Sequence, residues 1–302
     1  MSPMQPNPLL PKLGLTRHDR AVILLADDVG MCQASLAAYA ELLEAGLISA
    51  ASTMVPCPWF PATAALCRGR PTDQVDMGVH VTLTSEWEGY RWGPISSCGA
   101  SSGLIDEAGY LHATSAAVQE KADPAAVRRE IEAQVERALA AGIDVTHLDT
   151  HMGSVLHPRL VDTYVQVALQ RRIPPLLMRL DEAGFREMGV DRDSAALFAQ
   201  MMRVLEAQGL PLMDHLRLMS LDEPADRVEQ VKHVLQALPA GISYLIVHPA
   251  RDTPELRAIA PDWRCRVADL YAFTCDALRA FVEQSGIHVI GWRVLRTLMQ
   301  AG

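Results

Sequence analysis

The sequence predicts an α/β protein that forms one TIM-barrel-like (β/α) barrel. Short apolar runs typical of buried strands alternate with longer segments typical of helices, and this alternation favours a parallel sheet. About eight such units fill about 280 residues, which is the size of one barrel domain. Neither an internal repeat nor a low-complexity linker divides the 302-residue chain. We therefore expect a single domain over residues 21–302.

The first 20 residues precede this alternation. They contain four prolines and no apolar segment of the kind that a secretory signal carries. We expect residues 1–20 to form a flexible leader.

Each expected strand is a short apolar run, and helices fill the segments between the strands. Asp123 is expected to cap one helix, and Gly46 and Gly142 are each expected to end one. The strands are expected at residues 21–26, 50–55, 77–83, 143–149, 175–180, 213–218, 242–248 and 287–292. The helices are expected at residues 35–45, 124–141, 158–172, 194–208, 225–238 and 266–285. Residues 85–122 break the alternation, and we expect them to form a lid or loop insertion over the active-site face.

The composition limits the partners of the chain. The formal net charge is −9 and basic residues form no cluster, which argues against nucleic acid or an anionic membrane as the main partner. No apolar run reaches the ~18 residues of a membrane span. The six cysteines form no CxxC pair, so they predict reduced thiols in a cytoplasmic protein.

Two adjacent aspartates, Asp27 and Asp28, follow the apolar run at residues 21–26. Like charges on neighbouring residues repel, and neither carboxylate is buried cheaply without a partner. A bound cation would resolve this conflict, with one carboxylate as a ligand and the other as a base. The alternative is an ordinary strand-to-helix turn in which one aspartate caps the helix.

Other ionisable residues lie at the ends of later expected strands. His80 lies in the third strand, Arg179 near the end of the fifth and His248 at the end of the seventh. Because sites in parallel α/β folds lie at the carboxyl ends of the strands, these positions predict one active site. Alternatively, His80 is a hydrogen-bonded core residue and His248 a loop residue without a partner.

His147, Asp149 and His151 alternate by two residues, so on a strand they share one face. Three polar groups on a buried face need water, a metal ion or one another as partners, which indicates a site. In a helix, the i,i+4 spacing of the two histidines would also bring their imidazoles together as a metal pair.

A set of one carboxylate and two imidazoles with open positions suits zinc and tolerates other first-row divalent ions. Such a centre holds water and lowers its pKa towards neutrality. A nearby aspartate can then act as the base, and a histidine can protonate the leaving group. These groups predict a metal-assisted hydrolase of amides or esters. The sequence shows neither a glycine-rich phosphate loop nor a GxSxG elbow.

Four short motifs occur along the chain in an order typical of one protein family. They are Ala26-Asp27-Asp28-Val29-Gly30, Gly78-Val79-His80-Val81-Thr82-Leu83-Thr84, Thr146-His147-Leu148-Asp149-Thr150-His151 and His248-Pro249-Ala250. With these motifs the chain resembles the YdjC-like (ChbG/HpnK) carbohydrate deacetylases, whose patterns are NADDFG, GxHxTLT, THxDSHxHxH and a late HPG or HPA. The resemblance extends over residues 21–295, and residues 46–53 are also similar.

The resemblance implies a (β/α) barrel that deacetylates N-acetylated sugars with one divalent metal ion. Matched position by position, Asp28, His80 and His151 are the metal ligands, and Asp27 is the catalytic base. His248 matches the late histidine, which we expect to act as a general acid or to stabilise the oxyanion.

The resemblance also suggests supporting roles. Arg179 lies where the family has an arginine, and we expect it to orient the catalytic aspartate. His147 and Asp149 are expected to orient the ligands or to face the substrate. Trp87 and Trp92 form either a stacking platform for the sugar or the packing of a lid against the barrel.

The chain departs from the family patterns at three places. Ala26 and Val29 replace asparagine and phenylalanine, and Met152-Gly153-Ser154-Val155 replaces the histidine-rich tail after His151. The segment from Trp87 to Trp92 is a further difference. These departures concern substrate contacts and leave the three expected ligands in place.

The sequence as a whole thus predicts a cytoplasmic, metal-dependent deacetylase of an N-acetylated sugar or sugar conjugate. Zinc is the expected ion, with magnesium, cobalt and nickel as alternatives. The expected partner is the small sugar substrate, without nucleic acid or membrane, and a homodimer stays open. Two other functions also stay open: a metal-dependent amidohydrolase or esterase on a non-sugar substrate, and a non-catalytic sugar- or metal-binding protein.

Overall fold

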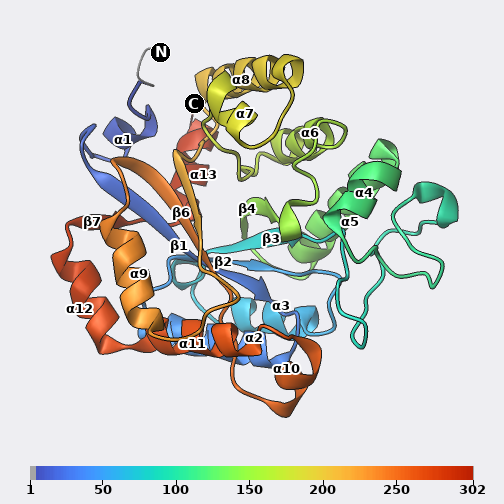
Figure 1. The fold of residues 1–302 in the computed structure, drawn as a ribbon, viewed down its shortest axis with the longest axis horizontal. Coiled ribbons are helices and arrows are strands. Elements are labelled where there is room, and N and C mark those ends of the chain that lie inside the picture. The colour runs from blue at the N-terminus through green and yellow to red at the C-terminus, as the bar shows by residue number, and fades with distance from the viewer. Residues whose placement is uncertain (1–4, 302) are drawn as a thin grey trace.

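The computed structural model describes residues 5–301 and shows an α/β fold around a parallel sheet (Figure 1). The sheet has seven strands, and six of them run in the order β4-β3-β2-β1-β6-β5, while β7 pairs with β1. Their bounds are β1 Arg20–Val29, β2 Ala50–Thr53, β3 Met77–Val81, β4 Val145–Thr150, β5 His215–Leu218, β6 Gly241–Val247 and β7 Ile287–Val289. The expected α/β class with a parallel sheet is therefore confirmed.

The strand expected at residues 175–180 is wrong, because within residues 5–301 this segment pairs only through the isolated bridges Leu148–Pro175 and Met178–Met213. The consecutive prolines 174 and 175 lack N–H groups and cannot donate to a regular ladder. The segment nevertheless connects the two edges of the sheet, which are β4 and the residues just before β5. The amide of Leu176 donates to Leu148 O at 2.7 Å, and the amide of Met213 donates to Leu177 O at 3.0 Å. The strands therefore follow one another around a TIM-barrel-like ring.

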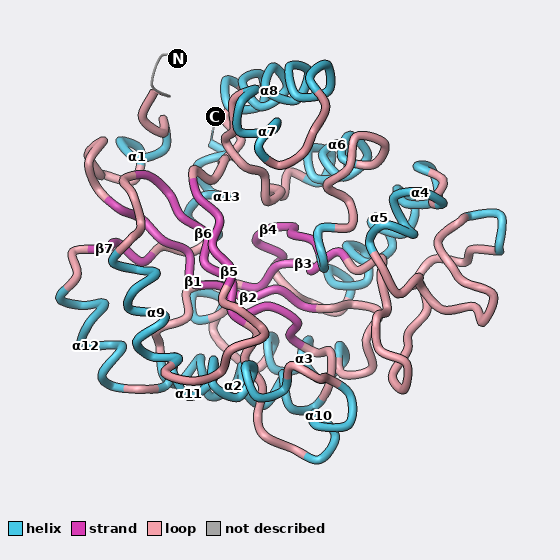
Figure 2. The backbone as a smooth tube through the Cα atoms, in the orientation of Figure 1, coloured by secondary structure: helices cyan, strands magenta, loops and turns pink. Residues whose placement is uncertain are grey.

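Helices lie outside the strands, as Figures 1 and 2 show. Their bounds are α1 Leu9–Lys12, α2 Gln33–Ala45, α3 Phe60–Arg68, α4 Ser115–Lys121, α5 Pro124–Ala140, α6 Val161–Arg171, α7 Glu182–Glu187, α8 Arg192–Ala207, α9 Arg227–Gln236, α10 Pro254–Ile259, α11 Trp263–Thr274, α12 Asp276–Gln284 and α13 Trp292–Ala301. The helix expected at residues 266–285 is two helices, because Cys275 adopts an extended backbone with φ −80° and ψ 130°. Among residues 5–301, every helix is too short or too polar to cross a bilayer.

Strand β1 is the central strand, and alternate side chains enter two apolar clusters. Val22 and Leu24 pack in the large cluster that includes helix residues, whereas Ile23 and Leu25 join a smaller cluster with Trp292. Burial on both faces explains why the run at residues 21–26 is continuously apolar.

Two segments outside the barrel strands also pack against it. Leu9 and Leu10, from the expected leader, are buried in the smaller cluster as part of α1. Most of residues 85–122 is loop in Figure 2, and the buried Trp92 anchors it by donating from Nε1 to Thr84 O at 2.8 Å.

Candidate metal centre and active site

The carboxyl end of β1 places Asp27 and Asp28 beside the same histidine. Successive side chains of a regular strand point to opposite faces. Here the register of β1 against β2 shifts between Ala26 and Val29, and Asp28 has φ 57°. Aspartate tolerates this left-handed conformation better than most residues. As a result Asp27 Oδ1 lies 3.0 Å from His80 Nδ1, and Asp28 Oδ1 lies 3.4 Å from His80 Nε2.

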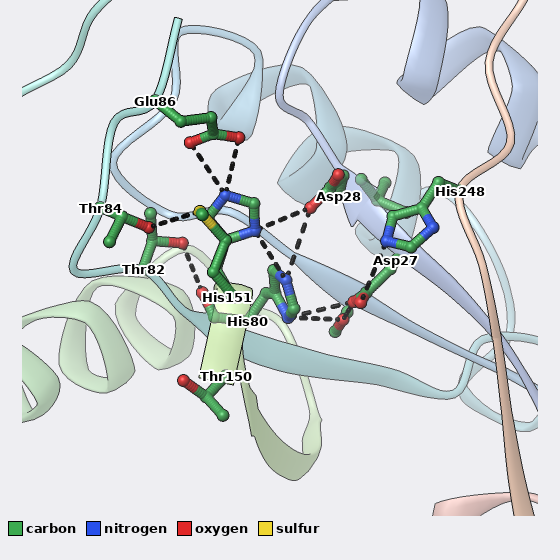
Figure 3. Close-up of polar contacts among 12 residues, drawn as sticks. Asp27, Asp28, His80, Thr82, Thr84, Glu86, Thr150, His151 and His248 are labelled. Atoms are coloured by element: carbon green, nitrogen blue, oxygen red, sulfur yellow. Dashed lines mark hydrogen bonds and ion pairs between the residues drawn. The ribbon is translucent and has the colours of Figure 1, made fainter. Parts of the chain in front are cut away.

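Asp28, His80 and His151 converge on one point, as Figure 3 shows. His151 Nδ1 lies 3.1 Å from Asp28 Oδ1 and 3.2 Å from His80 Nε2. Tetrahedral zinc with bonds of about 2.0–2.1 Å holds its donor atoms about 3.3 Å apart, so the triangle has the right size. All three side chains are buried, and among the residues that the structure describes Asp28 Oδ1 has no hydrogen-bond partner. An orphaned carboxylate oxygen beside two imidazole nitrogens fits a cation.

Carboxylates fix the orientation of both imidazoles. Asp149 Oδ1 lies 2.7 Å from His80 Nδ1, and the two oxygens of Glu86 lie 3.0 and 3.1 Å from His151 Nε2. A histidine that donates one ring N–H to a carboxylate presents its other nitrogen to a metal. His80 Nε2 and His151 Nδ1 are therefore the atoms available as ligands.

A second group of donor atoms consists of Asp27, His80 and Asp149. Protein hydroxyls already engage its carboxylates: Ser52 Oγ donates to Asp27 Oδ1 at 2.6 Å, and Tyr244 Oη donates to Asp149 Oδ2 at 3.1 Å. His80 Nδ1 is also engaged by Asp149 and is not available as a ligand. Asp27 and Asp149 therefore orient His80 for the group of Asp28, His80 and His151, and they are less suited to hold an ion themselves.

Burial sets the protonation of the residues around this centre. It raises the pKa of Asp27 to about 7, with His80 opposing the rise and Asp149 and Asp28 adding to it. Burial lowers the pKa of His248 to about 4. His248 Nε2 lies 3.8 Å from Asp27 Oδ2, so the two groups can share a proton path.

The backbone of His248 is held by a buried ion pair. Its amide donates to Asp269 Oδ2 at 2.9 Å, and Asp269 Oδ1 lies 2.8 Å from Arg227 Nε. All three residues are buried. The loop after β6 is thereby fixed to α11 and α9.

The arginine beside the centre is Arg266 of α11, not Arg179. Arg266 Nη1 donates to Asp28 Oδ2 at 2.7 Å, which leaves Asp28 Oδ1 free. Arg179 instead contacts Glu206 and lies 3.4 Å from Asp214 Oδ1. The expectation that Arg179 orients Asp27 is therefore corrected: its guanidinium is held by other carboxylates.

Three of the expected supporting residues lie around the centre without joining the triangle. His147 is fully buried, stacks on Trp292 at 4.9 Å, and its Nε2 is 3.8 Å from Asp149 Oδ2. Trp87 lies edge-to-face with Trp92 at 5.6 Å and 5.7 Å from the guanidinium carbon of Arg266. Trp92 is thus a packing residue, and Trp87 borders the centre.

Sequence reasoning missed Glu86, Arg266, Ser52, Tyr244 and Asp269. Glu86 follows β3 by only a few residues, so its position after a strand end was an available signal. Arg266 and Asp269 lie within a helix, and no local pattern distinguishes them from surface residues.

Comparisons with known proteins show a family, similar proteins and a shared fold. The family model described as YdjC-like protein matches residues 21–284. A "Carbohydrate deacetylase" of Thermus thermophilus is 35% identical over 292 residues, covering 95% of this chain and 98% of that protein. Another of the same name, from Thermoanaerobacter pseudethanolicus, is 23% identical and covers 91% of this chain and 99% of its own length. A crystal structure from Enterococcus faecalis, described as a cellobiose-phosphate cleavage protein, has a TM-score of 0.72 with this chain. The match covers 92% of this chain and 99% of that one at 19% identity, which shows a shared fold.

Proposed function

The chain belongs to the YdjC-like protein family, and on this premise we propose that it is a metal-dependent carbohydrate deacetylase. Its substrate would be an N-acetylated sugar or sugar conjugate. The observation that carries the proposal is the buried triangle of Asp28 Oδ1, His80 Nε2 and His151 Nδ1, with the base Asp27 beside it.

These three ligands favour zinc, although the donor set also accepts other first-row divalent ions. A divalent ion bound there would polarise the acetyl carbonyl and lower the pKa of a water molecule. Arg266 balances the charge of Asp28, and Glu86 and Asp149 hold the imidazoles in place.

Asp27 takes the proton of the attacking water in this proposal. Its Oδ1 is held by Ser52 and lies near His80, so Oδ2 is the oxygen that faces His248. With a pKa of about 7, the carboxyl group can both accept and release a proton near neutral pH.

His248 delivers a proton to the departing amine. Its low pKa of about 4 means that the ring is neutral before the reaction. Asp27 Oδ2 lies 3.8 Å from His248 Nε2, so the proton taken from the water reaches the departing nitrogen through this pair of side chains. Asp269 fixes the backbone of His248 for this transfer.

The proposal is tested by acetate release from N-acetylglucosamine and its short oligomers by the zinc-loaded protein. We expect Asp27→Asn to lower kcat by about 10²–10⁴-fold, the range for loss of a general base, while the metal content stays the same. Asp193→Asn, which changes an exposed aspartate of α8, is the matched control and should retain the wild-type rate. A metal-loaded wild type that releases no acetate from these sugars, or an unimpaired Asp27→Asn variant, would contradict the proposal.

A further inference from the structure

Glu130 of α5 is a fully buried carboxylate that the proposed reaction does not use. Both of its oxygens accept hydrogen bonds from the loop of residues 85–122. Oε1 accepts from the amide of Ile95 at 2.9 Å, and Oε2 accepts from the amide and the hydroxyl of Ser96 at 2.7 and 2.6 Å. A buried charge is costly unless such hydrogen bonds replace its water. These contacts therefore join the middle of the loop to α5.

The same carboxylate is linked to the strand that carries His80. Gln134, one turn further along α5, donates from Nε2 to Glu130 Oε1 at 2.8 Å and to Thr82 O at 2.7 Å, and its Oε1 accepts from the amide of Thr82 at 3.0 Å. Gln134 thus binds both backbone groups of Thr82, two residues after His80. Thr82 Oγ1 in turn donates to His80 O at 2.7 Å. The backbone that follows β3 is therefore also fixed to α5.

The arrangement around Glu130 suits a carboxylate and excludes its amide. Four donors surround the side chain, and two of them reach each oxygen. An ionised carboxylate accepts about four hydrogen bonds, whereas a glutamine side chain has a single acceptor oxygen and an NH₂ group that donates. In Glu130→Gln the NH₂ group would face two of these donors, whichever way the amide is turned, and would leave them without an acceptor.

Glu86 lies between the two attachments, since the Gln134 contact precedes it along the chain and the Glu130 contacts follow it. Its two oxygens lie 3.0 and 3.1 Å from His151 Nε2. The amide of Trp92 also donates, at 3.0 Å, to the hydroxyl of the residue that precedes Glu86. The place of Glu86 beside the metal ligand therefore depends on how the loop is held on α5.

We propose that Glu130 is a positioning residue for the metal centre. With Gln134 it forms an anchor that holds the loop of residues 85–122, so that Glu86 stays on the ring of His151. The loop is then a fixed wall of the site, and its anchor lies outside the site. This inference rests on the metal centre of the proposed function and is independent of the identity of the sugar.

The test measures the zinc affinity of the full chain by chelator competition. We expect Glu130→Gln to weaken zinc binding by about 10-fold, within the range of about 10–100-fold for loss of a carboxylate that orients a ligating histidine. In a Glu86→Ala background the same substitution should have no further effect, because its effect is transmitted through Glu86. Glu136→Gln, which changes an exposed residue of the same helix, is the matched control and should leave the zinc affinity unchanged. Wild-type affinity in Glu130→Gln, or losses that add in the double variant, would overturn the inference.

A second variant covers the case in which Glu130→Gln does not fold. Ser96→Ala removes one donor from a half-buried residue and should weaken zinc binding in the same direction by a smaller factor. Ser97→Ala, at the exposed neighbouring position, should have no effect. Equal zinc affinities of the wild type and Ser96→Ala would then count against the anchor.

Hydrogen exchange of the metal-free protein separates this inference from the proposed function. In Glu130→Gln the amide of Ile95 or of Ser96 should exchange about 10–100-fold faster than in the wild type, because it loses a hydrogen bond to a charged group. A wild type that binds no zinc would contradict the proposed function, and the exchange rates would then decide about the anchor alone. Faster exchange supports it, and unchanged exchange at both amides overturns it.

Discussion

Gly78, in the strand that carries His80, is expected to tolerate no side chain. A Cβ at this position would lie 2.5 Å from Cε1 and Nε2 of His147. The ring cannot move away, because it is fully buried and stacks on Trp292 at 4.9 Å. The two motifs that contain Gly78 and His147 are therefore interlocked by packing.

Gly78→Ala should lower the free energy of unfolding by about 3 kcal/mol, the upper part of the range for overpacked cores. For 302 residues an unfolding entropy of about 2.1 cal/mol/K per residue converts this into a fall in Tm of about 5 °C. Because β3 also carries His80, we expect zinc affinity to fall as well. Thermal and urea unfolding measure the first effect, and chelator competition measures the second.

Gly89→Ala is the matched control, since a Cβ there meets nothing within 4 Å. It should change the stability by less than about 0.5 kcal/mol. In a His147→Ala background, the extra cost of Gly78→Ala should largely disappear. A Gly78→Ala protein as stable as the wild type, or an unchanged cost without the His147 ring, would refute the packing argument.

Three further predictions concern the metal centre. Glu86→Ala should weaken zinc binding by about 10–100-fold, the range for loss of a carboxylate that orients a ligating histidine. Glu88→Ala, which changes an exposed residue of the same loop, should leave the zinc affinity unchanged. Equal zinc affinities of the wild type and Glu86→Ala in chelator competition would count against the role of Glu86. Burial lowers the pKa of His151, but Glu86 and Asp28 raise it to about 9, so zinc binding at pH 7 should release about one proton or more and should tighten as the pH rises towards 9. Calorimetry in buffers of different ionisation enthalpy would detect the released protons, and zinc binding without proton release would disprove this prediction. Zinc at about 100 times its Kd should stabilise the fold by about 2.7 kcal/mol, and this gain, read from unfolding curves, should vanish in His80→Ala.

The meeting of the strand ends in one site was predictable, because the carboxyl ends of parallel strands lie at the same rim. Asp28, His80 and His151 lie at the ends of three parallel strands, so the sequence alone indicated that they would meet. The alternation of apolar runs and helices likewise indicated the parallel sheet. These features depend on local patterns and on one general rule of α/β architecture.

The arginine partner was not predictable in the same way. Arg266 lies 238 residues after Asp28 and reaches it from a helix, so only the packing of α11 reveals the contact. Arg179 follows an expected strand, but the proline-containing segment before it forms no regular strand. The side chain of Arg179 pairs with Glu206 instead. Glu86 follows β3 closely, but it lies in the segment expected to form a lid, so sequence reasoning did not assign it to the site.

The bound metal per chain, measured by elemental analysis on the wild type and on His151→Ala, tests the central claim most directly. We predict about one divalent ion per wild-type chain and a clear loss in His151→Ala, while His157→Ala, which changes a histidine outside the triangle, retains the ion. A wild type that takes up no metal after reconstitution with zinc, cobalt or nickel, or a His151→Ala variant that keeps its ion, would contradict the proposed centre.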